Sequence, residues 1–162
     1  MDSFPIEQQS LRREILLVED SDSDARLIQR ALLIAGVANR VRHIDNGTEA
    51  VVYLRDLIET PGKPLPSVLF IDLKLPSMNG FGILSWLQQQ DGFSKTLRVV
   101  LTELNYIANV RKAYALGAHS FLSKPIGQED LHELITVFPD HWILTPGSAT
   151  ARAKTAEPIR TG

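Results

Sequence analysis

The chain contains no cysteine, which excludes both a disulfide framework and a thiolate metal site. Its formal net charge is only −2, so the chain offers no strongly basic surface of the kind that nucleic-acid binding requires. No hydrophobic run approaches the length of a membrane span, and residues 1–13 do not resemble a signal peptide. These absences predict a cytoplasmic protein that binds neither nucleic acid nor a membrane.

The composition is that of an ordinary globular protein, with 44% hydrophobic and 22% charged residues. At 162 residues the chain is expected to form one domain with short extensions. We place an N-terminal extension at 1–13, the domain with a short C-terminal extension at 14–144, and a tail at 145–162. Because the tail is rich in Pro, Gly, Ser and Thr, it is expected to be disordered, and the length leaves no room for an output domain.

Short apolar runs alternate with segments of helical periodicity, which predicts an α/β domain with a parallel sheet. The predicted strands are 14–18, 40–44, 68–72, 97–101 and 119–122. The predicted helices are 22–35, 48–58, 80–90, 106–116 and 128–138, and the second should direct Ala50, Val51, Leu54 and Ile58 inward. Right-handed crossovers then give a doubly wound, flavodoxin-like sheet of strand order 2-1-3-4-5 with helices on both faces.

Polar residues follow four of these strands and carry the candidate chemistry. Glu19 and Asp20 follow the first strand, and Asp72 ends the third. Thr102 and Lys124 follow the fourth and fifth strands. Any one of these could be a helix cap or a surface charge. Because the carboxyl ends of parallel strands converge, however, together they predict an oxygen-rich site for Mg²⁺, with donors for a phosphoryl group on Asp72.

These residues, with the Leu-Pro-x-Met-Asn-Gly stretch ending at Gly80, resemble the response-regulator receiver domain of two-component signalling over residues 14–138. The resemblance implies a phosphoacceptor protein that is not an enzyme beyond slow autodephosphorylation. It makes Asp72 the phosphoacceptor and Phe121 the aromatic switch residue, with a cis bond before Pro125. The resemblance also assigns Mg²⁺ to Asp20, Asp72 and the carbonyl of Lys74, with Glu19 acting through water, and assigns the phosphoryl oxygens to Thr102 and Lys124.

Two further stretches, 16–27 and 138–142, resemble stand-alone regulators that partner bacterial phytochrome histidine kinases. This resemblance implies a sensor histidine kinase as partner, of the bacteriophytochrome type.

Three positions are expected to tune phosphorylation and its lifetime. Glu103 stands where the receiver family usually has a small residue, so it either slows phosphorylation or turns into solvent. The resemblance to receiver domains implies that Lys74 and Leu104 flank the path of the hydrolytic water, and since neither acts as a base we expect slow autodephosphorylation. Two alternatives stay open: a pseudo-receiver that binds partners without phosphorylation, and a flavodoxin-type redox protein, which the acidic crevice disfavours.

An apolar segment follows the last predicted helix. It consists of Phe138, Trp142, Ile143 and Leu144, and it is too short for a domain and too hydrophobic for a free tail. These side chains are expected either to fold back on their own domain or to form the interface of a homodimer, the commonest soluble assembly. In the dimer, they would act together with the switch face formed by the predicted helices 106–116 and 128–138 and the predicted strand 119–122.

Overall fold

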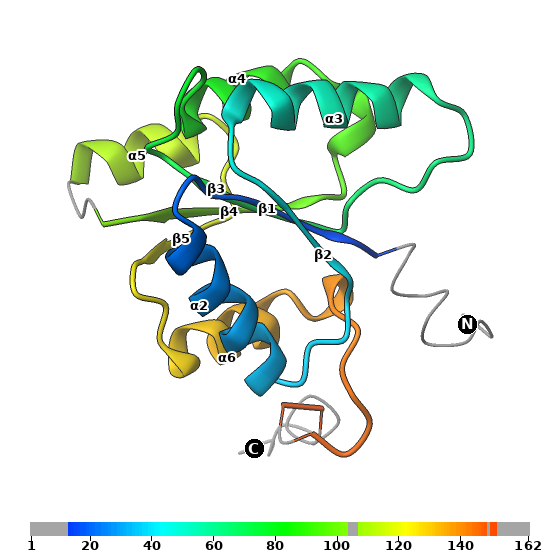
Figure 1. Cartoon of the computed structure of the whole chain (residues 1–162), viewed down its shortest axis with the longest axis vertical. Helices are drawn as coiled ribbons and strands as arrows, with labels where there is room; N and C mark the ends of the chain where they lie inside the picture. Colours follow the sequence, from blue (N-terminus) through cyan, green and yellow to red (C-terminus); the bar gives the residue numbers. More distant parts are fainter. Residues whose placement is uncertain (1–12, 104–106, 149, 152–162) are drawn as a thin grey trace, which may run out of the picture.

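The computed structural model describes residues 13–103, 107–148 and 150–151 of the chain. Five parallel strands form one sheet in the order β2-β1-β3-β4-β5, which confirms the predicted topology (Figure 1). The strands are β1 (Ile15–Val18), β2 (Val41–Ile44), β3 (Val68–Asp72), β4 (Leu97–Thr102) and β5 (Ser120–Ser123).

Helices cover both faces of the sheet, as predicted for a doubly wound fold (Figure 1). On one face lie α3 (Gly47–Glu59), α4 (Gly80–Gln88) and α5 (Ile107–Ala115), and on the other lie α2 (Asp22–Ile34) and α6 (Gln128–Val137). Two short 3-10 helices, η1 (Asp91–Phe93) and η2 (Pro139–His141), complete the described elements. None of the helices in the described residues is long and apolar enough to cross a membrane.

The interior strands differ from the edge strands in burial. Every residue of β1, β3 and β4 is buried, whereas β2 and most of β5 are only half-buried. Strands covered on both faces require apolar side chains in both directions, which explains the continuous hydrophobic runs in the sequence. Successive residues such as Leu16 and Leu17 therefore point to opposite faces of the sheet and belong to two separate cores, one on each face.

Side-chain caps start three helices close to the carboxyl ends of the strands. Ser21, Asn46 and Asn79 each accept a hydrogen bond from the backbone N–H three residues later, at 3.2, 3.0 and 3.0 Å. Such caps satisfy N–H groups that the first helical turn leaves unpaired. They begin α2, α3 and α4 at defined residues and so hold the connecting loops near the same edge of the sheet.

One predicted core position is wrong. Ile58 of α3 is 37% exposed, whereas its neighbour Leu57 is 7% exposed and belongs to the core. Steps of three and four residues from Ala50 reach Leu54 and then Leu57, so the buried face passes through Leu57 and leaves Ile58 at its margin.

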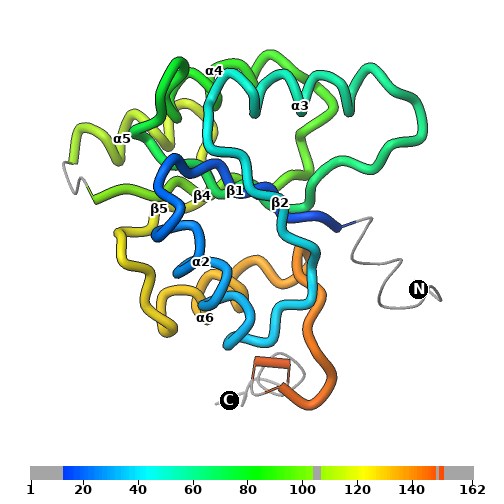
Figure 2. Tube along the Cα trace, in the orientation of Figure 1, coloured from blue at the N-terminus to red at the C-terminus, as the bar shows by residue number. Residues whose placement is uncertain are grey.

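The segment after α6 folds back along its own domain (Figure 2). Trp142 and Ile143 are 2% and 7% exposed, and the Trp142 ring lies 6.1 Å from the ring of Phe70 on β3. Phe138 and Leu144 pack partly buried against the same core. Of the two expectations for this segment, the structure agrees with the fold-back for Trp142 and Ile143, because the domain itself covers both side chains.

The structured C-terminal segment extends beyond the predicted boundary at residue 144. The backbone N–H of Thr145 donates to the carbonyl of Gly36 at 2.7 Å, and Thr150 is 7% exposed. Gly36 has a φ of +82°, and a Cβ there would lie 2.6 Å from the Cβ of Ser148, so glycine allows this close approach. The tail that was expected to be disordered is 145–162; the structure describes its residues 145–148 and 150–151, and the rest of it lies outside the described residues.

Candidate functional site

The acidic residues of β1 and β3 meet at the carboxyl edge of the sheet. The register pairs Val18 with Ile71, so Glu19 and Asp20 come directly beside Asp72. One carboxylate oxygen from each of the three lies within 4.8 Å of the others. Glu19 and Asp72 are buried, at 0% and 4% exposure, whereas Asp20 is exposed. The sheet topology therefore produces the predicted acidic cluster.

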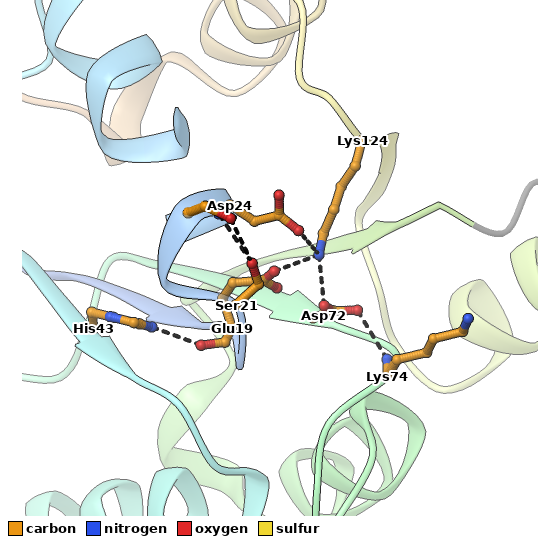
Figure 3. Close-up of polar contacts among 8 residues, drawn as sticks. Glu19, Ser21, Asp24, His43, Asp72, Lys74 and Lys124 are labelled. Carbon is orange, nitrogen blue, oxygen red and sulfur yellow. Dashed lines mark hydrogen bonds and ion pairs between the residues drawn. The ribbon is translucent and has the colours of Figure 1, made fainter. Parts of the chain in front are cut away.

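Lys124 is the cation of this cluster (Figure 3). Its Nζ lies 2.5 Å from Glu19 Oε1, 2.6 Å from Asp72 Oδ2 and 3.3 Å from Asp24 Oδ2, and its side chain is 9% exposed. Burial disfavours its charge, but the hydrogen bonds and charges of Asp72 and Glu19 outweigh that effect and raise the Lys124 pKa. Lys124 is therefore held as a charged donor beside Asp72.

Glu19 is a carboxyl group buried beside a second carboxyl group, that of Asp72, and its ionised form is disfavoured there. Burial, together with the hydrogen bond and charge of Asp72, raises the pKa of Glu19 to about 9, although Lys124 acts in the opposite direction. Glu19 Oε2 is buried and has no hydrogen-bond partner. A hard divalent cation fits these residues, because carboxylate oxygens are the ligands that Mg²⁺ prefers and its charge would compensate the buried oxygen.

Asp72 is fixed by its own loop. Its Oδ1 accepts a hydrogen bond from the backbone N–H of Lys74 at 2.9 Å, while Oδ2 faces Lys124. A Cβ at Gly80 would lie 2.5 Å from the carbonyl oxygen of Asp72, so only glycine lets α4 begin this close to the end of β3. The side chain of Lys74 is exposed and borders the cleft above Asp72.

Thr102 and Glu103 lie at the end of β4. The register pairs Asp72 with Leu101, which places Thr102 one residue further along the same edge. Thr102 is 1% exposed, and its carbonyl accepts a hydrogen bond from the backbone N–H of Lys124 at 3.0 Å. Glu103 is exposed and lines the cleft of about 150 Å³ that contains Asp72 and Lys124. The four predicted strand ends thus meet at one place.

The remaining predicted residues lie around this edge. Phe121 on β5 is partly buried against the core beneath α3, α4 and α5. The Lys124–Pro125 peptide bond is cis, as expected. Leu104 lies outside the described residues, so its position beside the cleft stays a prediction.

Two contacts of the site were missed by the sequence analysis. Asp24 was not predicted as a site residue, yet it contacts Lys124 from the first turn of α2. His43 on β2 was not considered, and its Nε2 lies 2.6 Å from the carbonyl oxygen of Glu19. The β1–β2 register, which pairs Leu17 with His43, is the signal that would have indicated His43.

Comparison with known proteins agrees with this geometry. The model of the response regulator receiver domain matches residues 15–136. A probable methanogenesis regulatory protein, FilR2 of Methanothrix harundinacea, is 35% identical over 138 residues, covering 83% of this chain and 88% of that protein.

Two solved structures also resemble the chain. The bacteriophytochrome response regulator AtBRR is 32% identical, with a TM-score of 0.70, covering 83% of this chain and 97% of that one. The Mn²⁺-bound form of response regulator Rcp1 is 27% identical, with a TM-score of 0.66, covering 82% of this chain and 98% of that one. Both proteins carry the same topology over nearly their whole length.

Proposed function

Because this chain belongs to the response regulator receiver domain family, we propose that Asp72 accepts a phosphoryl group from a histidine kinase and so switches partner binding. The observation that supports this proposal best is the position of Asp72 Oδ2, 2.6 Å from Lys124 Nζ and within a cluster of three carboxylates. A nucleophilic carboxylate beside a fixed cation is the arrangement that phosphoryl transfer requires.

The transfer follows from the two oxygens of Asp72. Oδ1 is engaged by the backbone N–H of Lys74, whereas Oδ2 faces Lys124 and the cleft. A lone pair of Oδ2 forms the new P–O bond while the P–N bond of a kinase phosphohistidine breaks. The electron pair of the P–N bond stays on the imidazole nitrogen. Lys124 then exchanges its contact with Oδ2 for one with a phosphoryl oxygen, and so stabilises the product without moving far.

We propose Mg²⁺ as the cofactor, held by Asp20, Asp72 and the carbonyl of Lys74, with Glu19 nearby. The buried, unpartnered Oε2 of Glu19 supports this assignment. A relative of the same family, Rcp1, has a Mn²⁺-bound form. When bound, Mg²⁺ supplies positive charge to the phosphoryl oxygens.

The proposed switch runs from Thr102 to Phe121. Thr102 is drawn toward a phosphoryl group on Asp72, and its movement makes room for Phe121 on β5. Since Phe121 has no hydroxyl, it can turn inward without burying an unsatisfied polar group. The change would alter the face formed by α5, β5 and α6, where Ile107, Tyr114 and Val137 are 70%, 47% and 60% exposed. Slow autodephosphorylation, tuned by Lys74, Glu103 and Leu104, would keep this signal for long.

The proposed partners are a sensor histidine kinase of the phytochrome type and a second copy of the chain. The similarity to AtBRR, a bacteriophytochrome response regulator, supports the first. The second copy of the chain would pack through the α5, β5 and α6 face rather than through the buried Trp142 and Ile143. Sedimentation with and without beryllium fluoride tests for this homodimer. A cytoplasmic location stays a prediction.

A phosphotransfer assay tests the main proposal. Autophosphorylated histidine kinases, bacteriophytochromes among them, are mixed with the wild-type chain, with Asp72→Asn, and with the control Asp91→Asn, which changes a carboxylate of η1. We expect radiolabel on the wild type and the control and none on Asp72→Asn. If no kinase labels the wild type, the pseudo-receiver alternative replaces the proposal. The observation that favours this alternative is the like-charged Glu103 at the cleft.

A further inference from the structure

The backbone of Glu19 is held by β2 on both of its polar groups. Its N–H donates to the carbonyl of Ile44 at 3.1 Å, which continues the sheet ladder by one residue. Its carbonyl oxygen lies 2.6 Å from Nε2 of the half-buried His43. A carbonyl can only accept, so Nε2 of His43 must be the donor. Figure 3 shows His43 reaching Glu19 from the strand next to β1.

This contact fixes the peptide group that joins Glu19 to Asp20. That peptide lies just beyond the end of β1, and the N–H of Glu19 that donates to Ile44 belongs to the preceding peptide, so this ladder contact does not itself restrain the Glu19–Asp20 peptide. The orientation of this peptide is defined by ψ of Glu19 and φ of Asp20, and a change in either torsion that the other does not compensate turns the Asp20 side chain relative to that of Glu19. The hydrogen bond from His43 therefore sets the directions of Glu19 and Asp20 toward Asp72.

The same end of β2 also touches the loop that follows Asp72. Asn46 Nδ2 donates to Ser77 Oγ at 3.2 Å, and Gly47 lies so close to the carbonyl of Met78 that no side chain would fit there. Ser77 has a φ of +69°, an uncommon conformation for a residue other than glycine. The β2–α3 corner thus holds both backbone segments that carry the acidic cluster, and His43 is its contact with the first of them.

We infer that His43 is a positioning residue of the divalent-cation site, acting through the Glu19 carbonyl on the directions of the Glu19 and Asp20 carboxylates. This inference rests on the proposed function, since it assumes that the acidic cluster binds Mg²⁺. Partners that orient metal ligands commonly govern metal affinity although they never touch the metal. His43 lies on β2 and contacts the backbone of Glu19, a residue of the acidic cluster at the end of β1, without belonging to the cluster itself.

Two substitutions of His43 separate the hydrogen bond from the presence of a polar side chain. The amide nitrogen of His43→Gln reaches the place of Nε2 and can donate to Glu19, whereas that of His43→Asn reaches only the place of Nδ1. His43→Phe keeps a ring of similar packing without any donor, and provides a second test should His43→Asn fold poorly. The matched control is His132→Asn, which changes an exposed histidine on α6 that does not line the cleft.

The measurement is Mg²⁺ affinity by isothermal titration calorimetry on the full chain, with urea unfolding of each variant in metal-free buffer. We expect His43→Asn and His43→Phe to weaken Mg²⁺ binding about tenfold, the lower end of the effects known for partners of metal ligands. His43→Gln and His132→Asn should bind as the wild type does. Equal affinity in all variants, or an equal loss in His43→Gln, overturns the inference.

Failure of the proposed function is recognised separately in the same experiment. If the wild-type chain binds no Mg²⁺, or if Asp20→Asn binds as well as the wild type, the proposed metal site is wrong. If the wild type binds Mg²⁺ through Asp20 while His43→Asn binds equally well, only the role of His43 is wrong.

Discussion

The carboxyl edge of the sheet, where the strands end, and the amino edge, where they begin, differ in how their buried polar groups are satisfied. At the carboxyl edge, buried Glu19 and Asp72 share the charge of Lys124, and one carboxylate oxygen stays unpartnered. At the amino edge, the buried side chain of Asn39 donates to the carbonyls of Arg13 and His141, at 2.6 and 3.3 Å, and accepts from the N–H of Ile143 at 2.7 Å. The first edge keeps a buried oxygen without a hydrogen-bond partner, which we propose that Mg²⁺ compensates, whereas the second is closed by neutral hydrogen bonds within the chain.

This difference suggests that chemistry and stability are separated in the molecule. Variants at the amino edge should lower stability and leave Mg²⁺ binding unchanged, whereas variants at the carboxyl edge should change ligand binding first. The following predictions test the separation, from the largest expected effect to the smallest.

Trp142→Ala should produce the largest loss of stability. Trp142 is 2% exposed, packs against Phe70, and donates from Nε1 to the carbonyl of Phe138 at 2.9 Å. Removing a large buried aromatic side chain costs about 3–5 kcal/mol of the free energy of unfolding. Urea unfolding measures this, with Val137→Ala, an exposed position, as the control. A loss no larger than that of the control would mean that the fold-back segment contributes little to the domain.

Asn39→Ala should cost about 2 kcal/mol, because it leaves buried partners without their hydrogen bonds. The affected groups are the N–H of Ile143 and the carbonyls of Arg13 and His141. Urea unfolding compares this variant with Asn109→Ala on α5. If Asn39→Ala changed Mg²⁺ affinity as well, the two edges would be coupled and the separation would be wrong.

The two edges also differ in how far the sequence predicted them. The carboxyl edge was predictable because its residue types, Glu19-Asp20, Asp72, Thr102 and Lys124, stand directly at strand ends, and parallel topology brings such ends together. The amino edge was not, because its contacts use main-chain groups and one asparagine, which leave no periodic pattern in the sequence. The sequence analysis could therefore place Trp142 and Ile143 in an apolar segment but could not decide what covers them.

The raised pKa of Glu19 predicts proton release when Mg²⁺ binds. Burial and the neighbouring Asp72 raise this pKa from its ordinary value of 4.5 to about 9 in the metal-free fold, so the ionised form of Glu19 is disfavoured there. A cation favours the ionised form and lowers the pKa, so binding should release a fraction of a proton and affinity should increase with pH up to about 9. Binding enthalpies in buffers of different ionisation enthalpy measure the release, which should vanish in Glu19→Gln. Proton uptake by the wild type would contradict this account of the cluster.

Glu103→Ala should have the smallest effect, on the rate of phosphorylation by acetyl phosphate. Glu103 is exposed at the cleft and repels an anionic donor, but solvent screens such a charge, so we expect about a threefold increase in rate. The control is Glu129→Ala, an exposed carboxylate at the start of α6. No change, or an equal change in both variants, would mean that Glu103 points into solvent and does not influence the site.

The most direct test of the central claim is the intact mass of the chain after incubation with acetyl phosphate. With Mg²⁺, the wild type should gain the mass of one phosphoryl group, and with a chelator it should gain none. The Asp72→Asn variant should gain none in either condition, while the stability variant Asn39→Ala and its control Asn109→Ala should be phosphorylated as the wild type is. A phosphoryl group on Asp72→Asn, or one on the wild type that forms equally well without a divalent cation, would contradict the account.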